Sequence, residues 1–260
     1  MQFQIPLAAE SVTQFLLRVV ACLAVISFLT RMTLYFLPDY PSRDFLAMAF
    51  NVDGEGNIPT LYSFLALLFS SFLLGAIAYA KSLDRCRYQH HWKILSFIFL
   101  GLSLDEVFQW HEHLIGLRSL LHATGFLYFT WVVPMGFLVA IFLLSYSKFL
   151  FHLPVSTKKL FVAATAVYIG GAIGMEMVGG YLASTRGQEN VAYVLETTIE
   201  ESLEMLGIVV FIHALISYIK TSLGGVSWNI YIPGKNTQVT DPQNIGLPAL
   251  HEPANTNLLK

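Results

Sequence analysis

Residues Val191–Ile219 read VAYVLETTIEESLEMLGIVVFIHALISYI, and this stretch decides the fold class. A membrane-spanning helix needs about 20 mainly apolar residues, and the stretch is longer than that. It nevertheless carries four glutamates in its first half, where each ionised side chain costs at least about 2.5–3.5 kcal/mol to insert into a bilayer. The stretch therefore predicts a membrane helix whose acidic side chains face protein, water or a bound cation.

Five earlier stretches share this length and apolar character. The six predicted spans, including the one quoted above, are Gln14–Leu37, Thr60–Ala80, Trp92–Trp110, Gly125–Leu150, Leu160–Ala183 and Val191–Ile219. The first lacks a positively charged leader and a small-residue cleavage pattern, so we interpret it as a retained helix. The sequence predicts an all-α fold, a polytopic membrane bundle of six transmembrane helices.

The composition supports the membrane class and excludes others. Of the 260 residues, 55% are hydrophobic and 12% are charged, about half the ~25% charged share of soluble domains. The 15 Lys and Arg against 17 Asp and Glu leave no basic face for a nucleic acid. Cys22 lies in an apolar run and Cys86 in a basic loop, so no disulfide framework is expected.

Lysine and arginine set the predicted orientation, because they concentrate in cytoplasmic loops. We therefore predict a multi-pass protein of the bacterial inner or plasma membrane, with both termini in the cytoplasm. Residues 1–13 form a short cytoplasmic N-terminus, 14–219 the bundle, and 220–260 a disordered cytoplasmic tail rich in Asn, Gly, Thr and Pro. The basic residues of the two loops predicted to be cytoplasmic are Lys81, Arg85, Arg87, Lys93, Lys148, Lys158 and Lys159.

Seven acidic side chains fall within the predicted spans, in the half nearer the outside. At 1.5 Å per residue, Asp105 lies about 18 Å beyond Lys93, and Glu176 about 24 Å beyond Leu160. If every acid faced lipid, insertion would cost roughly 20 kcal/mol in total, more than the stability of a typical domain. Asp53 and Glu55, in an outer loop, are expected above the same place. The seven are Asp105, Glu106, Glu176, Glu196, Glu200, Glu201 and Glu204.

Helix phase indicates that these acids share one cavity. At 100° per residue, the four glutamates of the last span fall within about 140° of arc. If the third span stays helical to the outer surface, His113 shares its acidic face and His111 points away. The candidate metal ligands are Asp105, Glu106, Glu112, His113, Glu176, Glu200, Glu201 and Glu204.

Arg31 is the only basic residue predicted at a comparable depth in the outer half of the spans. A single positive charge cannot neutralise seven acids. Like charges in a low dielectric favour protonated carboxyl groups, and a divalent metal ion is the other way to balance the charge. Oxygen ligands suit calcium, magnesium or manganese, and an imidazole such as His113 admits zinc or iron. The candidate cofactor is thus a divalent metal ion whose identity stays open.

A stripe of small residues, Ala166, Gly170 and Gly174, recurs every four positions in the fifth span. Such a stripe lets another helix approach closely. Glu176 projects from a different face of the same helix, so we predict that the stripe and the acid serve different neighbours.

Two stretches resemble motifs of uncharacterised bacterial multi-pass membrane proteins, some of them cyanobacterial. NVDGEGNIPTLYS at 51–63 and LSLDEVFQWHE at 102–112 match the patterns NxDGExNIPTxYS and LSLDExxxxHE, and ETTIEESLEMLG at 196–207 belongs to the same similarity. The resemblance implies no named activity. It implies one shared pattern for Asp53, Glu55, Asp105, Glu106, His111, Glu112, Glu200, Glu201 and Glu204.

Three classes of function remain open. The first is a transporter whose carboxylates bind a proton or metal while the bundle rocks around them. The second is a membrane metalloenzyme with a Glu, Asp and His centre between helices, although no Glu-x-x-His lies within a span and GxSxG and HExxH are missing. The third is a non-catalytic membrane assembly or accessory protein. Acids at several depths favour the transporter, with the lipid bilayer and a small cation as partners.

Overall fold

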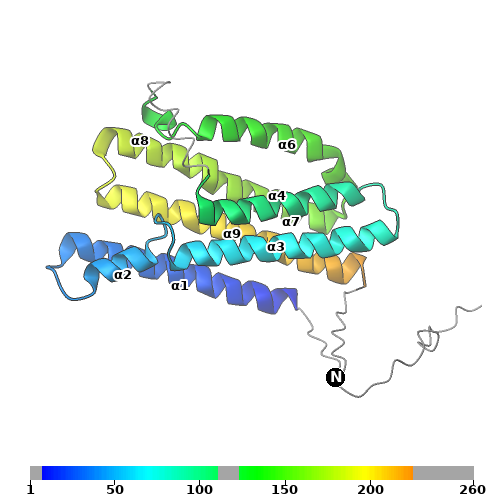
Figure 1. The fold of residues 1–260 in the computed structure, drawn as a ribbon, viewed down its shortest axis with the longest axis horizontal. Helices are drawn as coiled ribbons and strands as arrows, with labels where there is room; N and C mark the ends of the chain where they lie inside the picture. The colour runs from blue at the N-terminus through cyan, green and yellow to red at the C-terminus, as the bar shows by residue number, and fades with distance from the viewer. Residues whose placement is uncertain (1–7, 111–122, 225–260) are drawn as a thin grey trace, which may run out of the picture. The chain divides into compact units, whose positions relative to one another are not determined.

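Helices make up all the regular structure that the computed structural model describes, which covers residues 8–110 and 123–224 (Figure 1). A π-helical segment, Gly170–Met175, continues one helix into the next, and a 3-10 turn occupies Gly125–Leu127. The all-α prediction is therefore confirmed. The helices are α1 (Ala9–Phe36), α2 (Arg43–Phe50), α3 (Ile58–Leu83), α4 (Gln89–Phe108), α6 (Val132–His152), α7 (Val155–Ile169), α8 (Glu176–Arg186) and α9 (Val191–Ser222).

Five helices of the described chain are long and apolar enough to cross a membrane. They are α1, α3, α6, α9 and the continuous helix Val155–Arg186 formed by α7 and α8. The predicted span Trp92–Trp110 corresponds to α4, which does not belong to this group. Lys93 near one end of α4 and Asp105 and Glu106 near the other shorten its apolar part. The structure thus has the helices of a multi-pass membrane protein, five of them with clear spanning character.

α4 ends earlier than the sequence predicts. Gln109 adopts the left-handed conformation with φ of 56°, and its N–H donates to the carbonyl oxygen of Asp105 at 2.7 Å. A residue in this conformation closes a helix, so α4 stops at Phe108. The expectation of a helix that persists to the outer surface is therefore wrong. Glu112 and His113, which depended on it, lie outside the described residues.

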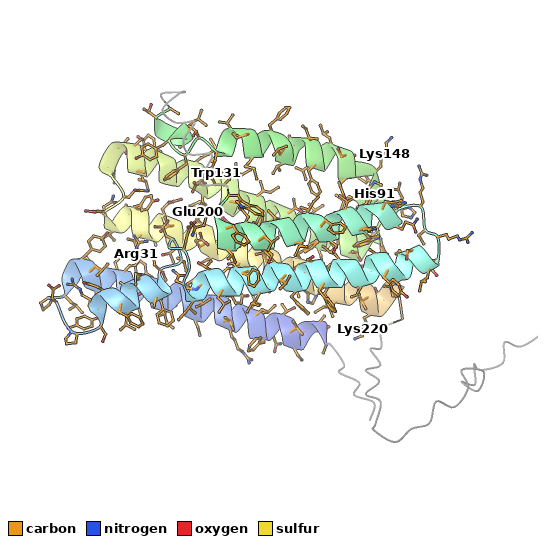
Figure 2. All side chains as sticks on the ribbon, in the orientation of Figure 1. Arg31, His91, Trp131, Lys148, Glu200 and Lys220 are labelled. Carbon is orange, nitrogen blue, oxygen red and sulfur yellow. The ribbon has the colours of Figure 1, made fainter. Side chains whose placement is uncertain are left out.

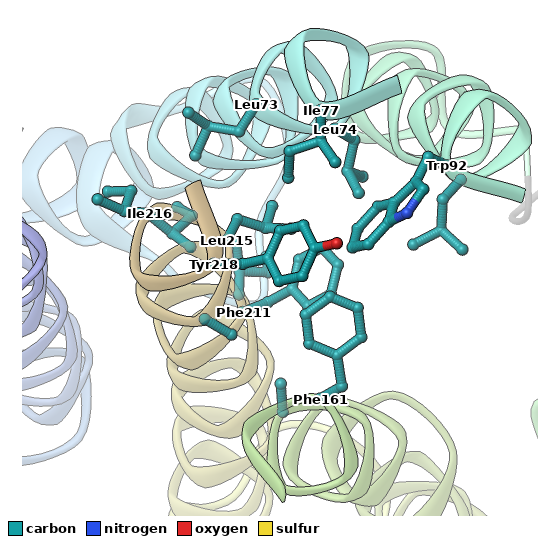
Figure 3. Packing of buried hydrophobic residues seen from close by; sticks show 14 of the residues in the cluster. Leu73, Leu74, Ile77, Trp92, Phe161, Phe211, Leu215, Ile216 and Tyr218 are labelled. Carbon is teal, nitrogen blue, oxygen red and sulfur yellow. The ribbon is translucent and has the colours of Figure 1, made fainter. Parts of the chain in front are cut away.

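α9 lies at the centre of the hydrophobic core. Its Phe211 stacks on Phe99 of α4, with ring centroids 4.5 Å apart, and packs against Phe161 of α7 at 4.8 Å. Figure 3 shows the same core around Tyr218 and Trp92, whose rings lie 5.0 Å apart. Lipid is as apolar as these side chains, so close van der Waals packing stabilises such contacts inside a bilayer.

Two glycines let α9 and the helix formed by α7 and α8 touch backbone to backbone. A Cβ on Gly207 would lie 2.8 Å from the backbone nitrogen of Tyr168 in α7. A Cβ on Gly171, in the π-helical segment, would lie 2.9 Å from the carbonyl oxygen of Glu200. Neither position can hold a larger side chain without moving a helix apart from its neighbour.

The predicted stripe of small residues is wrong in its register. A Cβ on Gly170 or Gly174 would meet nothing within 4 Å, whereas Gly171 and Gly179 both face α9. In a regular α-helix, positions eight residues apart differ by about 80° in direction. A π turn inserts one extra residue, which reduces that difference to about 20° and brings both glycines onto one face.

The loop at residues 51–57 is recessed between the helices. Thr13 Oγ1 of α1 and His213 Nδ1 of α9 lie 2.8 Å apart, which puts these two residues at one level. From that level, Ser27 lies about 21 Å along α1 and Glu200 about 20 Å along α9. The backbone N–H of Val52 donates to Ser27 Oγ at 3.0 Å, so the loop lies level with Glu200.

The outer ends of the helices extend well past this loop. α1 continues nine residues beyond Ser27 to Phe36, which is about 14 Å. Figure 1 shows how α2 then runs back beside α1 toward the start of α3. Asp53 and Glu55 were expected above the acids; the loop that carries them lies beside the acids instead, at the level of Glu200, because α2 runs back along α1.

Candidate functional site

The acid cluster consists of the acidic side chains that α4, α8 and α9 bring together in the half of the bundle nearer Phe36 and Val191. Glu176 connects these helices to α6. The indole Nε1 of Trp131, just before α6, donates to Glu176 Oε1 at 2.8 Å. Figure 2 labels Trp131, just before α6, and Glu200, on α9, in this region. The members of the cluster are Asp105, Glu106, Glu176, Glu196, Glu200, Glu201 and Glu204.

Glu176 and Glu200 form a pair across α8 and α9. Their carboxyl groups lie close enough for a hydrogen bond between them, and Glu200 is 7% exposed. A carboxylate can only accept hydrogen bonds, whereas a protonated carboxyl group also donates one. A hydrogen bond between two carboxyl groups therefore requires a proton on one of them.

Glu196 has the smallest exposed fraction among the acids of the cluster. It is 5% exposed, and neither of its carboxylate oxygens has a hydrogen-bond partner of acceptable geometry within the described chain. It lies against Gly179, where an added Cβ would come 2.6 Å from Oε2. A buried polar group without a partner is costly, so this carboxyl group has capacity for a proton or a cation.

Glu201 and Glu204 continue the cluster further along α9. Glu201 interacts electrostatically with Glu204 and with Glu106 of α4, and Glu204 interacts with the same Glu106. Tyr168 of α7 lies among them, close enough to interact with Glu204, Glu106 and Asp105. The phenol is a neutral group that can donate to any of these carboxyl groups.

Arg31 holds the recessed loop beside the cluster. Its Nη1 donates to Asn51 Oδ1 at 2.8 Å and to Asp53 Oδ2 at 3.1 Å. Asp53 in turn interacts electrostatically with Glu196 and Glu201. The positive charge expected near the acids is therefore present, and the ion pair that it forms is with the loop.

Most of the predicted ligands come together in this region, and two cannot be placed. Glu112 and His113 lie outside the described residues. Within 8–110 and 123–224, no group of three or more His, Cys, Asp or Glu has the arrangement of a metal site. The divalent metal ion therefore stays a prediction. The six placed ligands are Asp105, Glu106, Glu176, Glu200, Glu201 and Glu204.

A family model matches residues 16–219, which is most of the chain. The chain belongs to this family, described as Domain of unknown function (DUF8692). The DUF8692 match includes Arg31, the recessed loop and every member of the acid cluster. No curated protein and no solved structure matched the chain.

Sequence reasoning left several residues out of the candidate site in this DUF8692 chain. Glu196 was not among the predicted ligands, because a glutamate so near the start of α9 is also typical of a wet helix end. Trp131 and Tyr168 have the pattern of ordinary membrane aromatics. The Gly179–Gly180 pair was the one available signal, since adjacent glycines indicate a close approach.

Proposed function

We propose that this DUF8692 protein is an integral membrane protein that binds a cation at the acid cluster, in the manner of a transporter, and that the cation is a proton. The observation that carries the proposal is the close approach of the Glu176 and Glu200 carboxyl groups, near enough to share a hydrogen bond. Such a pair holds one proton between two carboxyl groups, and moving that proton is the simplest chemistry it offers.

The surroundings of the pair support this choice of cation. Trp131 donates to Glu176 and fixes its orientation, while Glu196 lies one turn from Glu200, with its carboxyl group buried against the backbone of Gly179. A proton held by the Glu176–Glu200 pair therefore has a second buried acceptor nearby, the carboxyl group of Glu196. Glu201 and Glu204 then supply further acceptors along α9, so carboxyl groups at several depths form a path of the kind that a transporter requires.

The topology that we propose has six crossings, with α4 as the sixth. Its Asp105 and Glu106 interact with groups on α7 and α9, which keeps them from lipid. The Lys and Arg distribution places both termini in the cytoplasm, and the acid cluster then lies in the outer half of a bacterial inner or plasma membrane.

A divalent metal is the second candidate for the same site. It is favoured by the electrostatic contact among Glu201, Glu204 and Glu106, since carboxylate oxygens bind hard divalent cations. This alternative includes a membrane metalloenzyme, and a non-catalytic assembly role is the third possibility. No contact among the described residues favours the metalloenzyme or the assembly role as specifically as the carboxyl pair favours the proton.

Binding and stability measurements on Glu→Gln variants separate proton from metal. A glutamine is nearly isosteric with a protonated glutamate, so Glu200→Gln should melt at or above the wild-type temperature if Glu200 is neutral. Glu189→Gln, just before α9 and exposed, is the matched control. Calorimetric titration of the wild type with calcium, manganese, zinc and ferrous iron should show no binding. If the wild type binds a metal and Glu204→Gln abolishes that binding, the cation of the site is a metal and the proton proposal is wrong.

A further inference from the structure

We infer that residues 51–57 are a plug on the outer side of the acid cluster, latched by Arg31 and Asp53, and that a cation reaches the cluster from outside when this loop leaves its seat. The inference rests on the proposed function. It assigns control of access to a segment outside the acid cluster itself. α2 and the loop are the moving part, and α1 and α9 form the seat.

The latch is a partly buried ion pair. The Arg31 side chain is 14% exposed and that of Asp53 is 30% exposed. The other ion pairs of the described chain join Arg43 to Asp39 and Asp44, within the turn that leads into α2. Removing one partner of an enclosed pair leaves the other charge uncompensated. The Arg31–Asp53 contact is thus suited to decide whether the loop stays seated.

The seat is apolar and lies next to the cluster. Val52 is 5% exposed and packs with Met205 and Val209 of α9 and with Leu23 of α1. Met205 is fully buried and directly follows Glu204. When the loop leaves, Val52 uncovers the face of α9 that Met205 and Val209 share with Glu201.

Ionisation of the neighbouring glutamates opposes the seated position. Asp53 interacts with Glu196 and Glu201, and charges of the same sign held close together in a low dielectric repel one another. Arg31 offsets this repulsion on the side of α1. A cation that binds Asp53 competes with Arg31, so its arrival from outside weakens the latch.

The plug is built to move as one piece. Asn57 Nδ2 donates to the carbonyl oxygen of Asn51 at 2.7 Å, which closes the loop on itself. α2 buries a single residue, Ala47, while Phe45 and Met48 are 64% and 69% exposed. Few contacts therefore need to break for α2 and the loop to swing away.

Thiol labelling from outside measures opening of the plug. Met205→Cys in a background with Cys22→Ala and Cys86→Ala places a single thiol beneath Val52. The full-length protein is reconstituted in sealed vesicles and treated with a membrane-impermeant maleimide. Arg31→Leu should raise the labelling rate by roughly tenfold or more, since a factor of ten corresponds to about 1.4 kcal/mol. Arg43→Leu, which removes an ion pair away from the seat, should leave the rate unchanged.

Further variants keep the test decisive. If Arg31→Leu does not fold, Asp53→Asn should raise the rate in the same way, and the exchange Arg31→Asp with Asp53→Arg should restore slow labelling. Equal rates with Arg31→Leu and Arg43→Leu, or labelling before any latch substitution as fast as at Glu189→Cys, would overturn the plug.

The comparison of Arg31→Leu with its control does not require a proton on the Glu176–Glu200 pair. Faster labelling with Arg31→Leu, together with no protonated carboxyl group in the infrared spectrum of the wild type, would keep the plug and remove the proton site. If Arg31→Leu does not speed labelling but the wild type does show a protonated carboxyl group, the plug is contradicted and the proton site remains.

Discussion

Trp131 and Glu176 form a hydrogen bond of 2.8 Å that ties the start of α6 to the start of α8. α6 buries two residues, Val132 and Phe149, one near each end, so specific contacts at its ends anchor it. Because Glu176 also lies close enough to Glu200 for a hydrogen bond, one carboxyl group connects α6, α8 and α9. The integrity of the helix packing and the state of the acid cluster are therefore linked.

Loss of the indole donor should destabilise the protein. Trp131→Phe keeps an aromatic ring and removes the N–H, and a hydrogen bond to a charged group contributes about 1.5–3 kcal/mol. The melting temperature in detergent should fall clearly. Trp110→Phe is the control, since Trp110 is 53% exposed. Equal melting temperatures for the two variants would show that the Glu176 contact contributes nothing.

The glycine contacts between α7 and α9 predict a contrast between two alanine substitutions. Gly207→Ala introduces a Cβ 2.8 Å from the Tyr168 backbone nitrogen, which forces the helices apart and should cost about 1–3 kcal/mol. Gly170→Ala meets nothing within 4 Å and should be neutral or stabilising, because alanine favours a helix. Thermal unfolding of both variants tests this, and similar losses would contradict the packing described here.

The two arginines of α1 should differ in their effect on stability. Arg31→Leu removes the partner of Asp53, whose enclosed position makes the loss about 1–3 kcal/mol after allowance for solvent. Arg18 is exposed, and its charge can reach the headgroups, so Arg18→Leu should change little. Melting curves of the two variants check the difference. Equal losses would mean that Arg31 has no special partner.

The sequence allowed the helices to be predicted well, because long apolar runs leave few alternatives in a membrane. The boundaries were less predictable. α4 ends at Phe108 because Gln109 adopts the left-handed conformation. No glycine or proline at this position indicates the helix end in the sequence. α1 begins at Ala9 and α9 reaches Ser222, so both helices extend beyond residues 14–219.

The sequence allowed the acidic residues of the candidate site to be named, but it did not allow their positions relative to one another to be predicted. Helix phase predicted one shared face for the glutamates of α9, but it could not predict the π turn at Gly170–Met175, which shifts the register of every residue after it. The recessed loop depends on the contact of Val52 with Met205, which joins residues far apart in the chain. Periodicity within one helix carries no information about either feature.

Labelling from the two sides of the membrane tests the proposed topology. Ser82→Cys, in the last turn of α3, should react only from the cytoplasmic side, and Glu189→Cys, between α8 and α9, only from outside. Both positions are exposed. Asn57 is a poorer probe, because its side chain caps α3 by accepting from the N–H of Thr60 at 3.2 Å. Reaction of both positions from one side would contradict the six-span arrangement.

Infrared spectroscopy of the shared proton tests the central claim most directly. The carbonyl stretch of protonated carboxyl groups is compared at neutral pH in the wild type, Glu176→Gln, Glu200→Gln, the double variant and Glu189→Gln. Because the pair holds a single proton, the double variant should lose the band of one carboxyl group and no more, neither single variant should lose more than the double one, and Glu189→Gln should match the wild type. A wild type without this band, or a double variant that loses the band of two carboxyl groups, would contradict a proton shared between Glu176 and Glu200.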